Sequence, residues 1–487
     1  MQRIQRFDLA ALGNWLYSWV QPSGAIYGFH NHSVWGDNPI RWADYTSGHS
    51  TFAAPLMPAL AMLLEKSPNE RGVALLETLM QYQAASMRPD GEYKHIGFQT
   101  GELAKTGLIH NMVPALSLAL AVCHGKTILH PKTIEAARLS VHRALDEGGL
   151  HYGGGRAGKE ACCNQDYARI WAKLLVKPAF GEGCYEQQAQ QDLDFMVENF
   201  HVPGVPDADC DGTLRALEGK DQYLLEPAEY YGLMIAPLCL AYRQYGQQRW
   251  LNAAMRLARH VVRSSFVDEN GCRRVHRAYY LRADGSWGKL TQPMQVQGNG
   301  LTLLAVHECA QLTADPELLA FVEQMEHTME YYQTRRGFLC AATGWNTEAD
   351  AAPCTAWQSH DFLYAAQTIP TLGADFWDKL FAPVEECSVV LAPNCVWIEQ
   401  GKRWAIQDYF SRSAYQLLGR KDRLCFGRDL AWTGEKNNVD ASYHWDYMPV
   451  FVLDDGCVAP LRPLPGNVAV YNFSNYDMKL TYKENAK

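Results

Sequence analysis

The sequence predicts a mainly α fold, an (α/α) toroid of helical hairpins over residues 1–383, followed by a mainly β domain over residues 384–487. The first observation behind this prediction is a series of segments in which apolar residues recur at helical spacing. The second is that the loops between these segments are long and chemically varied, which favours a closed ring over a short-period solenoid. The third is a change to β-rich runs near residue 383.

The predicted helices follow one another with readable starts and turns. Asp315-Pro316 and His130-Pro131 each open a helix with proline in the first turn, and 67–70 precedes another. Tight turns are expected at the Asp-Gly and Asn-Gly pairs in 88–93, 268–271 and 282–287, because glycine accepts a positive φ. The predicted helical segments are 48–65, 70–87, 110–124, 132–147, 164–176, 184–200, 227–245, 248–265, 298–313, 316–333 and 356–369.

After residue 383 the apolar pattern changes from helical spacing to short runs rich in Val, Ile and aromatic residues. Gly, Pro, Asn and Asp separate these runs, as they do between strands. Strands are therefore expected at 388–392, 395–399, 449–453 and 468–471.

Composition and charge argue against several classes of function. The formal net charge is −9, and no block of basic residues occurs, so neither nucleic acid nor a membrane is an expected partner. No apolar run reaches the roughly 18 residues of a membrane span, and the first residues lack a signal-peptide pattern. The 14 cysteines are scattered through helical segments, so reduced thiols and a cytoplasmic location are expected. No cofactor or metal site is expected, and the oligomeric state stays open.

An acidic segment that runs into an apolar helix carries a family resemblance. Residues 226–238 read Glu-Pro-Ala-Glu-Tyr-Tyr-Gly-Leu-Met-Ile-Ala-Pro-Leu, 249–254 read Arg-Trp-Leu-Asn-Ala-Ala, and 297–305 read Gln-Gly-Asn-Gly-Leu-Thr-Leu-Leu-Ala. These segments resemble a hairpin and the Arg-Gly-Asn-Gly-Trp turn of six-hairpin glycosidases, with Gln297 in place of Arg and Leu301 in place of Trp. The resemblance implies a six-hairpin-type ring that acts on a carbohydrate.

A second motif near the beginning of the sequence implies different chemistry. Residues 30–35 read His-Asn-His-Ser-Val-Trp. They resemble the Asn-Asn-His-x-Tyr-Trp motif of toroid polysaccharide lyases such as alginate lyases. This resemblance implies cleavage by β-elimination.

Hydrolysis of a glycosidic bond requires two carboxyl groups, one to protonate the leaving oxygen and one to activate water or attack the anomeric carbon. Acidic residues expected at junctions of loops and helices are Asp37, Asp44, Glu92, Asp166, Glu229 and Asp361. We rank four of them as catalytic candidates, because each lies among aromatic, His or Asn residues: Asp37, Glu92, Asp166 and Glu229. The alternative for each is a helix cap or a solvated turn residue.

Elimination from a uronate instead requires a base, an acid and polar groups that neutralise the carboxylate, and His and Tyr suit the first two roles. The catalytic candidates for this reaction are His32, His110 and Tyr167. The predicted substrate-binding residues are His30, Asn31, Trp35, His49, His95, Asn111, Asn164, Arg169, Gln297, Asn299, Trp357 and His360. The alternative for an isolated histidine is a core residue with satisfied hydrogen bonds.

Two cysteine-containing motifs resemble zinc ligands of lanthionine-forming ring proteins, namely Cys123-His124-Gly125 and Cys162-Cys163. The upstream cysteine motif of that family has no counterpart here, and Cys123 ends an apolar helix. Structural cysteines are therefore favoured over a zinc site.

These patterns together predict an enzyme that cleaves a glycosidic bond in a small oligosaccharide, expected to contain a uronate. Glycoside hydrolysis is favoured, and polysaccharide or oligosaccharide lyase chemistry is the alternative. Epimerisation of a sugar on the same ring and a non-catalytic helical scaffold are further alternatives.

Overall fold

The computed structural model describes residues 7–20, 23–24, 26, 53–93, 108–148, 163–215, 224–276, 278–290, 294–334, 337–339, 342–343 and 355–384, together with short strands between 387 and 480. Its helices are α1 (Leu9–Ser18), α4 (Leu56–Lys66), α5 (Glu70–Ala85), α6 (Leu108–Gly125), α7 (Pro131–Asp146), α8 (Cys163–Phe180), α9 (Glu186–Phe200), α10 (Tyr231–Tyr245), α11 (Gln248–Ser264), α12 (Gly300–Thr313), α13 (Pro316–Tyr332), α14 (Thr355–Thr368) and α15 (Phe376–Leu380). None of these helices is both long and apolar enough to cross a membrane.

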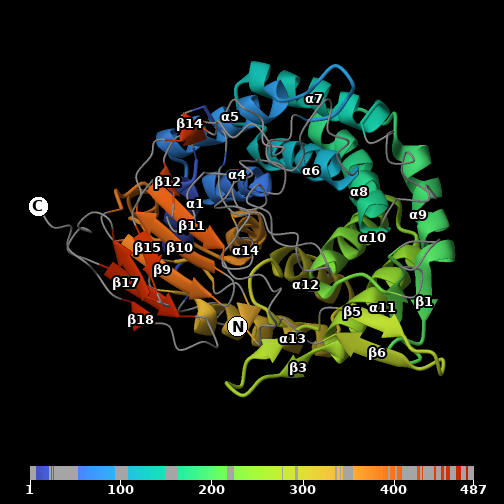
Figure 1. Cartoon of the computed structure of the whole chain (residues 1–487). Coiled ribbons are helices and arrows are strands. Elements are labelled where there is room, and N and C mark those ends of the chain that lie inside the picture. The colour runs from blue at the N-terminus through green and yellow to red at the C-terminus, as the bar shows by residue number, and fades with distance from the viewer. Residues whose placement is uncertain are drawn as a thin grey trace, which may run out of the picture.

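The helices form a closed ring of two layers (Figure 1). The inner helices α4, α6, α8, α10, α12 and α14 pack side by side in this order, and α14 packs against α4. The helices α5, α7, α9, α11 and α13 each pack outside the inner helix that precedes them, and α1 packs against α14. The predicted (α/α) toroid is therefore confirmed.

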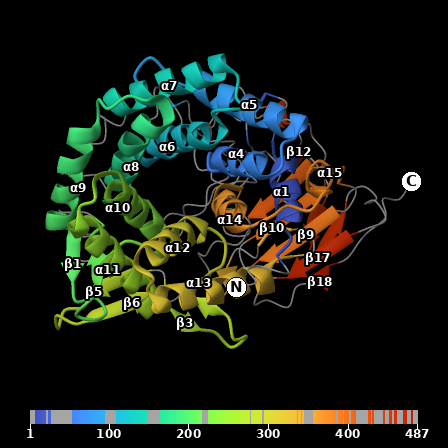
Figure 2. The ribbon, with the colours of Figure 1, turned by 180° about the vertical axis from the view of Figure 1, so that it is seen from behind.

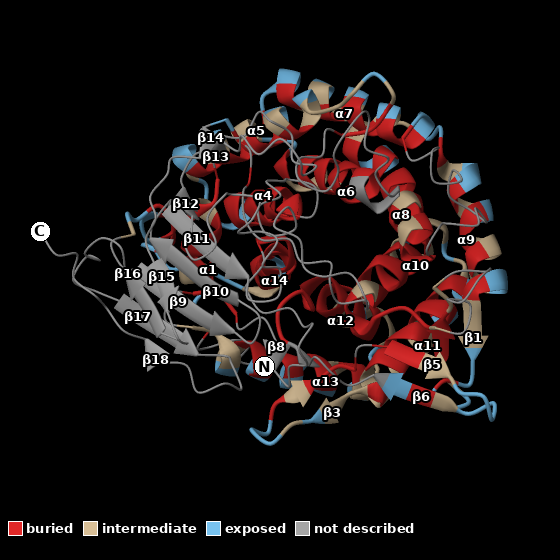
Figure 3. Cartoon of the chain, viewed as in Figure 1, coloured by how far each residue is buried: buried red, intermediate tan, exposed pale blue. Residues whose placement is uncertain are grey.

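The two layers differ in burial in the way that their sequences predict (Figure 3). All positions of α4 from Leu56 to Leu64 are buried, because an inner helix contacts neighbours on every side. Outer helices are amphipathic: in α11, Trp250 and Leu257 are buried while Asn252 is exposed. The apolar core therefore lies between and within the layers and fixes the positions of the inner helices.

Hydrogen bonds between residues far apart in the sequence close the ring. The Lys66 ammonium at the end of α4 donates to the carbonyl oxygens of Ala366, Gln367 and Ile369 at 2.6, 2.8 and 2.7 Å. These carbonyls lie at the carboxyl end of α14, where helix carbonyls lack partners and cations are favourable. Lys66 on α4, the first inner helix that the structure describes, thus caps α14, the last one.

The connections on the two ends of the ring differ in length. Inner helices are joined to the following outer helices by short turns, at 67–69, 126–130, 181–185, 246–247 and 314–315. The connections back to inner helices are much longer, at 86–107, 147–162, 201–230, 265–299 and 333–354. We call the end where the inner helices begin the N-terminal end of the ring, and long connections of this kind are where binding residues concentrate.

Glycines allow the inner helices to approach one another at this end. A Cβ atom on Gly232 would lie 2.3 Å from the Leu301 carbonyl, and one on Gly300 would lie 2.0 Å from the His360 carbonyl. The first turns of α10 and α12 and the second turn of α14 therefore touch through backbone atoms, which brings the polar residues around them close together.

The predicted helices agree with the observed ones apart from their ends. The helix expected from 48 begins only at Leu56, and the one expected from 227 begins with a 3-10 turn at Ala228–Tyr230 before α10. The predicted turns are confirmed, because Gly91, Gly271 and Gly285 have φ of 80, 76 and 82°. The helix α1 was not predicted.

Short strands accompany the long connections, and a larger set follows the last helix (Figure 2). Those among the helices are β1 (His201–Pro203), β2 (Asp211–Thr213), β3 (Phe266–Val267), β4 (Arg273–Arg274), β5 (Ala278–Leu281), β6 (Trp287–Leu290), β7 (Met294–Gln295) and β8 (Ala342–Thr343). Those after α15 are β9 (Cys387–Ala392), β10 (Cys395–Gln400), β11 (Arg403–Asp408), β12 (Cys425–Gly427), β13 (Leu430–Ala431), β14 (His444–Trp445), β15 (Phe451–Asp454), β16 (Cys457–Pro460), β17 (Val468–Asn472) and β18 (Lys479–Leu480).

The strands after α15 include the four predicted runs. One sheet has the order β12-β11-β10-β9-β17, in which β17 pairs parallel to β9 and the other pairs are antiparallel. A smaller sheet has the order β15-β16-β18. The division into a ring domain and a β domain at residue 383 remains a proposal.

Candidate active site

A buried glutamate at the N-terminal end of the ring organises the candidate site. Glu226 is fully buried in the segment before α10. Its Oε2 accepts a hydrogen bond from Asn164 Nδ2 at 2.9 Å, and its Oε1 accepts one from the Asn164 backbone N–H at 3.2 Å. The first turn of α8 therefore holds the carboxyl group that the connection before α10 presents.

The surroundings of Glu226 favour a proton on its carboxyl group. Burial, with a smaller contribution from the charge of Glu229, raises the pKa of Glu226 to about 7. The Arg215 guanidinium and the hydrogen bonds from Asn164 oppose this shift. A carboxyl group with a pKa near 7 beside a second acidic residue has the form expected of a general acid.

Aromatic residues from two inner-helix starts meet beside this acidic segment. The ring of Tyr230, which follows Glu229, lies 5.8 Å from the ring of Trp357 at an interplanar angle of 31°. His360 lies one turn along α14, with its ring 5.3 Å from that of Trp357. The segment before α10 and the start of α14 thus contribute to the same group, across α12.

The turn before α12 is held by residues of α14. The Asp361 carboxylate accepts the backbone N–H groups of Gly298 and Gly300 at 2.7 and 2.9 Å. Burial raises the pKa of Asp361 to about 8, against these hydrogen bonds. Because its oxygens point at the start of α12, Asp361 acts as a helix cap, which was the structural alternative for this residue.

Two predicted substrate-binding residues in the same turn make contacts within the protein. Gln297 Oε1 accepts a hydrogen bond from Gln358 Nε2 at 2.9 Å, and Asn299 Nδ2 donates to the Val296 carbonyl at 3.0 Å. Both side chains are almost fully buried. Their arrangement fixes the turn against α14, and their predicted contact with a substrate stays a prediction.

Asp166 and Arg169 lie on a different face of α8 from Asn164, the residue that contacts Glu226. Together with Lys173 they line a cavity of about 90 Å³ between α8 and α9, whose opposite wall includes Asp192. Lys173 Nζ donates to Asp192 Oδ2 at 2.8 Å, and Arg169 Nη2 donates to the Leu145 carbonyl at 2.7 Å. These residues therefore surround a cavity between the ring's layers, whereas Asn164 contacts Glu226.

Tyr167 also contacts the outer layer. Its hydroxyl lies 2.7 Å from His201 Nε2, and His201 Nδ1 lies 3.8 Å from Asp211, which pairs with Arg256 at 2.7 Å. Burial raises the pKa of Tyr167 well above its ordinary value. The structure thus gives Tyr167 a place in a Tyr-His-Asp-Arg chain that runs from the buried Tyr167 to the partly exposed Arg256.

The remaining predicted residues fall into two groups. Glu92, in the connection after α5, and Asn111, in the first turn of α6, are both buried. Asn111 Oδ1 accepts a hydrogen bond from the Tyr93 backbone N–H at 2.9 Å, which links the connection to the helix. His110 lies in α6, but its side chain is outside the described residues. Also outside the described residues are His30, Asn31, His32, Trp35, Asp37, Asp44, His49 and His95.

Glu226 and Tyr230 were not among the site residues expected from the sequence. Both lie in the acidic segment that carried the family resemblance, with Glu229 between them. A signal was present in Glu226-Pro227, since a glutamate that precedes an apolar helix after a long connection is placed at the end of the ring. The sequence could not show that Glu226 faces Asn164.

Comparison with known proteins finds this fold in enzymes that act on sugars. A sugar epimerase from a ruminal bacterium has a TM-score of 0.55 at 8% identity, over 75% of this chain and 97% of that chain. A cellobiose 2-epimerase from Bacillus thermoamylovorans B4167 has a TM-score of 0.52 at 8% identity, over 73% of this chain and 96% of that chain. An α-1,6-mannanase from Salegentibacter sp. HEL1_6 has a TM-score of 0.50 at 13% identity, over 74% of this chain and 98% of that chain.

No protein family matches the sequence, and no curated protein matches it. At the identities of the structural neighbours, the likeness shows the fold alone. The (α/α) toroid expected from the hairpin resemblance is thus confirmed by comparison as well as by the closed ring.

Proposed function

We propose that this chain is a carbohydrate-active enzyme that hydrolyses a glycosidic bond at the N-terminal end of its ring. Glu226 is the general acid that protonates the leaving oxygen, and Glu229 is the second carboxyl group. The observation that supports this most directly is the buried Glu226 carboxyl, whose pKa is raised to about 7 beside another glutamate. Glycosidases need such a pair, with one carboxyl group kept protonated near neutral pH.

The residues around this pair suit a sugar. The half-buried Tyr230 and the adjacent Trp357 form an aromatic wall, and aromatic faces pack well against the C–H faces of sugar rings. Arg215 supplies a positive charge next to Glu226, which suits a uronate. An inactive variant of the mannanase mentioned above was solved in complex with α-1,6-mannotriose, so a protein with this fold can bind an oligosaccharide.

The test is a panel of uronate-containing and neutral oligosaccharides, followed by product analysis. We expect new reducing ends without a new conjugated double bond, which elimination would create. Glu226→Gln should lower turnover by about 10²–10⁴-fold, because it removes the proton donor. The control is Glu326→Gln on outer helix α13, another buried glutamate, whose Oε1 accepts from Tyr364 at 2.6 Å. Full activity of Glu226→Gln, or no turnover on any sugar, would contradict the proposal.

Epimerisation is the second candidate, and His360 favours it. An epimerase needs a general base, and His360 beside the aromatic wall is of a residue type that serves in this role. In that case the product would be an epimer with no change in reducing ends, which NMR of the sugar distinguishes. His360→Gln, rather than Glu226→Gln, would then abolish turnover.

A further inference from the structure

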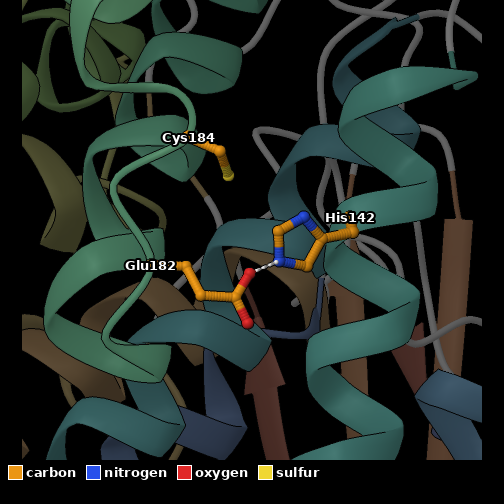
Figure 4. Close-up of side chains that lie close together, drawn as sticks. All are labelled: His142, Glu182 and Cys184. Carbon is orange, nitrogen blue, oxygen red and sulfur yellow. Dashed lines mark ion pairs between the residues drawn. The ribbon is translucent and has the colours of Figure 1, made fainter.

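Three residues with metal-binding side chains meet on the outer layer of the ring (Figure 4). His142 comes from outer helix α7, while Glu182 and Cys184 come from the turn that joins α8 to α9. Their donor atoms, one from each side chain, all lie within 4.8 Å of one another. None of them belongs to the candidate active site.

The tautomer of His142 is set by a hydrogen-bonded chain behind it. The Tyr185 hydroxyl donates to Asp146 Oδ1 at 2.7 Å. The oxygen of this Tyr185 hydroxyl lies 3.0 Å from His142 Nδ1. Since the hydroxyl hydrogen is used for Asp146, the Tyr185 oxygen accepts from Nδ1–H. In neutral imidazole this leaves Nε2 with its lone pair free to act as a ligand.

That lone pair faces a carboxylate. His142 Nε2 lies 2.8 Å from Glu182 Oε2, yet it is shielded from solvent and makes no aligned hydrogen bond to any described residue. Two electron-rich atoms at this distance repel each other unless a positive centre lies between or beside them. A proton on Nε2 would supply one, and so would a metal ion.

Cys184, the third side chain, favours a metal ion over a proton. Cys184 is an exposed, free cysteine whose thiolate is a soft ligand. Zinc bonds of about 2.0 Å to nitrogen or oxygen and about 2.3 Å to sulfur place tetrahedral donors roughly 3.3–3.8 Å apart. The observed spacing needs only small side-chain adjustments to reach this geometry. Arg138 Nη1 holds the other Glu182 oxygen at 3.1 Å and orients the carboxylate.

We propose that His142, Glu182 and Cys184 bind a zinc-class transition-metal ion through Nε2, Oε2 and Sγ, with water as the fourth ligand. The thiol proton passes to solvent when the ion binds. Tyr185 and Asp146 fix the imidazole from behind, as carboxylate-linked partners do at known zinc sites. The ion pins the turn between α8 and α9 to α7.

The test is metal binding by the full chain after treatment with a chelator. Zn²⁺ is titrated in competition with a chromophoric chelator, and Co²⁺ reports thiolate ligation through its charge-transfer band. We expect Cys184→Ser and His142→Ala each to lose one equivalent of tight zinc and the corresponding cobalt–thiolate absorbance. Tyr185→Phe keeps all three ligands, so it should retain the band at saturation while weakening the affinity by about 10–100-fold.

Cys123→Ser is the matched control, because Cys123 is another free cysteine beside a histidine that pairs with a glutamate, His124 with Glu65. It should bind as the unmodified chain does. Equal zinc stoichiometry and equal cobalt spectra in the unmodified chain and Cys184→Ser would overturn the proposal. So would the absence of any zinc-dependent rise in Tm, which is the result for a plain His142–Glu182 ion pair.

Discussion

Two buried carboxyl groups at the N-terminal end of the ring have similar pKa shifts but different environments. The pKa of Glu226 is raised to about 7 and that of Asp361 to about 8, both mainly by burial. Both carboxyl oxygens of Asp361 accept hydrogen bonds from the backbone of the turn before α12. Glu226 is held by one side chain, Asn164, and has an acidic neighbour, so it is the one suited to proton transfer.

The pH dependence of activity follows from Glu226. A general acid must be protonated, so kcat/KM should fall as pH rises through about 7. Asn164→Ala removes a hydrogen bond that lowers the pKa of Glu226, so this fall should move to higher pH. A pH profile of both proteins checks it, with exposed Asn199→Ala as the control. An unchanged profile in Asn164→Ala would show that another group titrates.

The same shift affects stability in a defined direction. The folded-state pKa of Glu226 lies above its ordinary value of 4.5, so its contribution to the free energy of unfolding is full below that value. The contribution is lost as pH rises from there through about 7. The stability from Glu226 is therefore lost between pH 4.5 and about 7, and the activity falls as pH rises through about 7.

At this scale the sequence identified types of residue better than their directions. Asp166 and Tyr167 were chosen for their polar and aromatic neighbours, but their side chains face α9 and β1. On a helix buried between two layers, every face carries a buried residue, so periodicity does not reveal which face meets the ring's interior. Glu226 was missed for another reason: it lies in a connection, and its burial depends on contacts with α8 that leave no local pattern.

At the scale of elements, the inner helices are kept in place by backbone contacts at their first turns. Thr302 Oγ1 accepts the Gly232 backbone N–H at 3.0 Å and donates to the Ala228 carbonyl at 2.9 Å. This single threonine links the start of α12 to the 3-10 turn beside Glu229. The acidic segment is therefore positioned by helix packing as well as by its own contacts.

Gly232→Ala should destabilise the protein although alanine favours helices. Helix propensity alone predicts a gain of roughly 1 kcal/mol, whereas a Cβ at 2.3 Å from the Leu301 backbone predicts a loss of about 1–3 kcal/mol. Urea unfolding measures the sign. Gly373→Ala is the control, since its nearest neighbour is a side-chain oxygen of Asp375 at 3.1 Å. A gain in stability for Gly232→Ala would show that α10 and α12 are loosely packed.

Most elements were predictable from the sequence because the apolar periodicity is local. The helices α1 and α15 were not predicted, and α1 contains Asn14, a polar residue in a buried position. Its side-chain amide donates to the carbonyls of Leu380 and Ala382 at 2.9 and 2.8 Å, at the far end of the helical region. A contact between residues so distant in sequence leaves no local pattern, so this helix could not be recognised.

At the scale of the whole molecule, polar contacts between described residues far apart in the sequence contribute to closure of the ring. Besides Lys66, Gln333 joins the N-terminal segment to the end of α13: its Oε1 accepts the Asp8 backbone N–H at 2.7 Å and its Nε2 donates to the Asp8 carbonyl at 2.9 Å. The apolar packing of α4 against α14 supplies the rest of the closure.

Lys66→Met should weaken this closure. It removes three hydrogen bonds to the carboxyl end of α14 and a charge that complements the helix dipole, for a loss of about 1–2 kcal/mol. Chemical denaturation measures it, and exposed Lys132→Met on α7 controls for the loss of a surface lysine. If the two variants lose equal stability, the cap has no special role.

The cap by Lys66 has a consequence for how the protein is made. Its acceptors lie 300–303 residues further along the chain, so a ribosome must release nearly the whole helical region before they exist. Until then α4 exposes an apolar flank that α14 later covers, and such surfaces promote aggregation. Completed hairpins can pack against their neighbours during translation, but α4 and α14 can pack together only after α14 has been synthesised. Nascent chains that stall before α14 are therefore the form of this protein most dependent on chaperones.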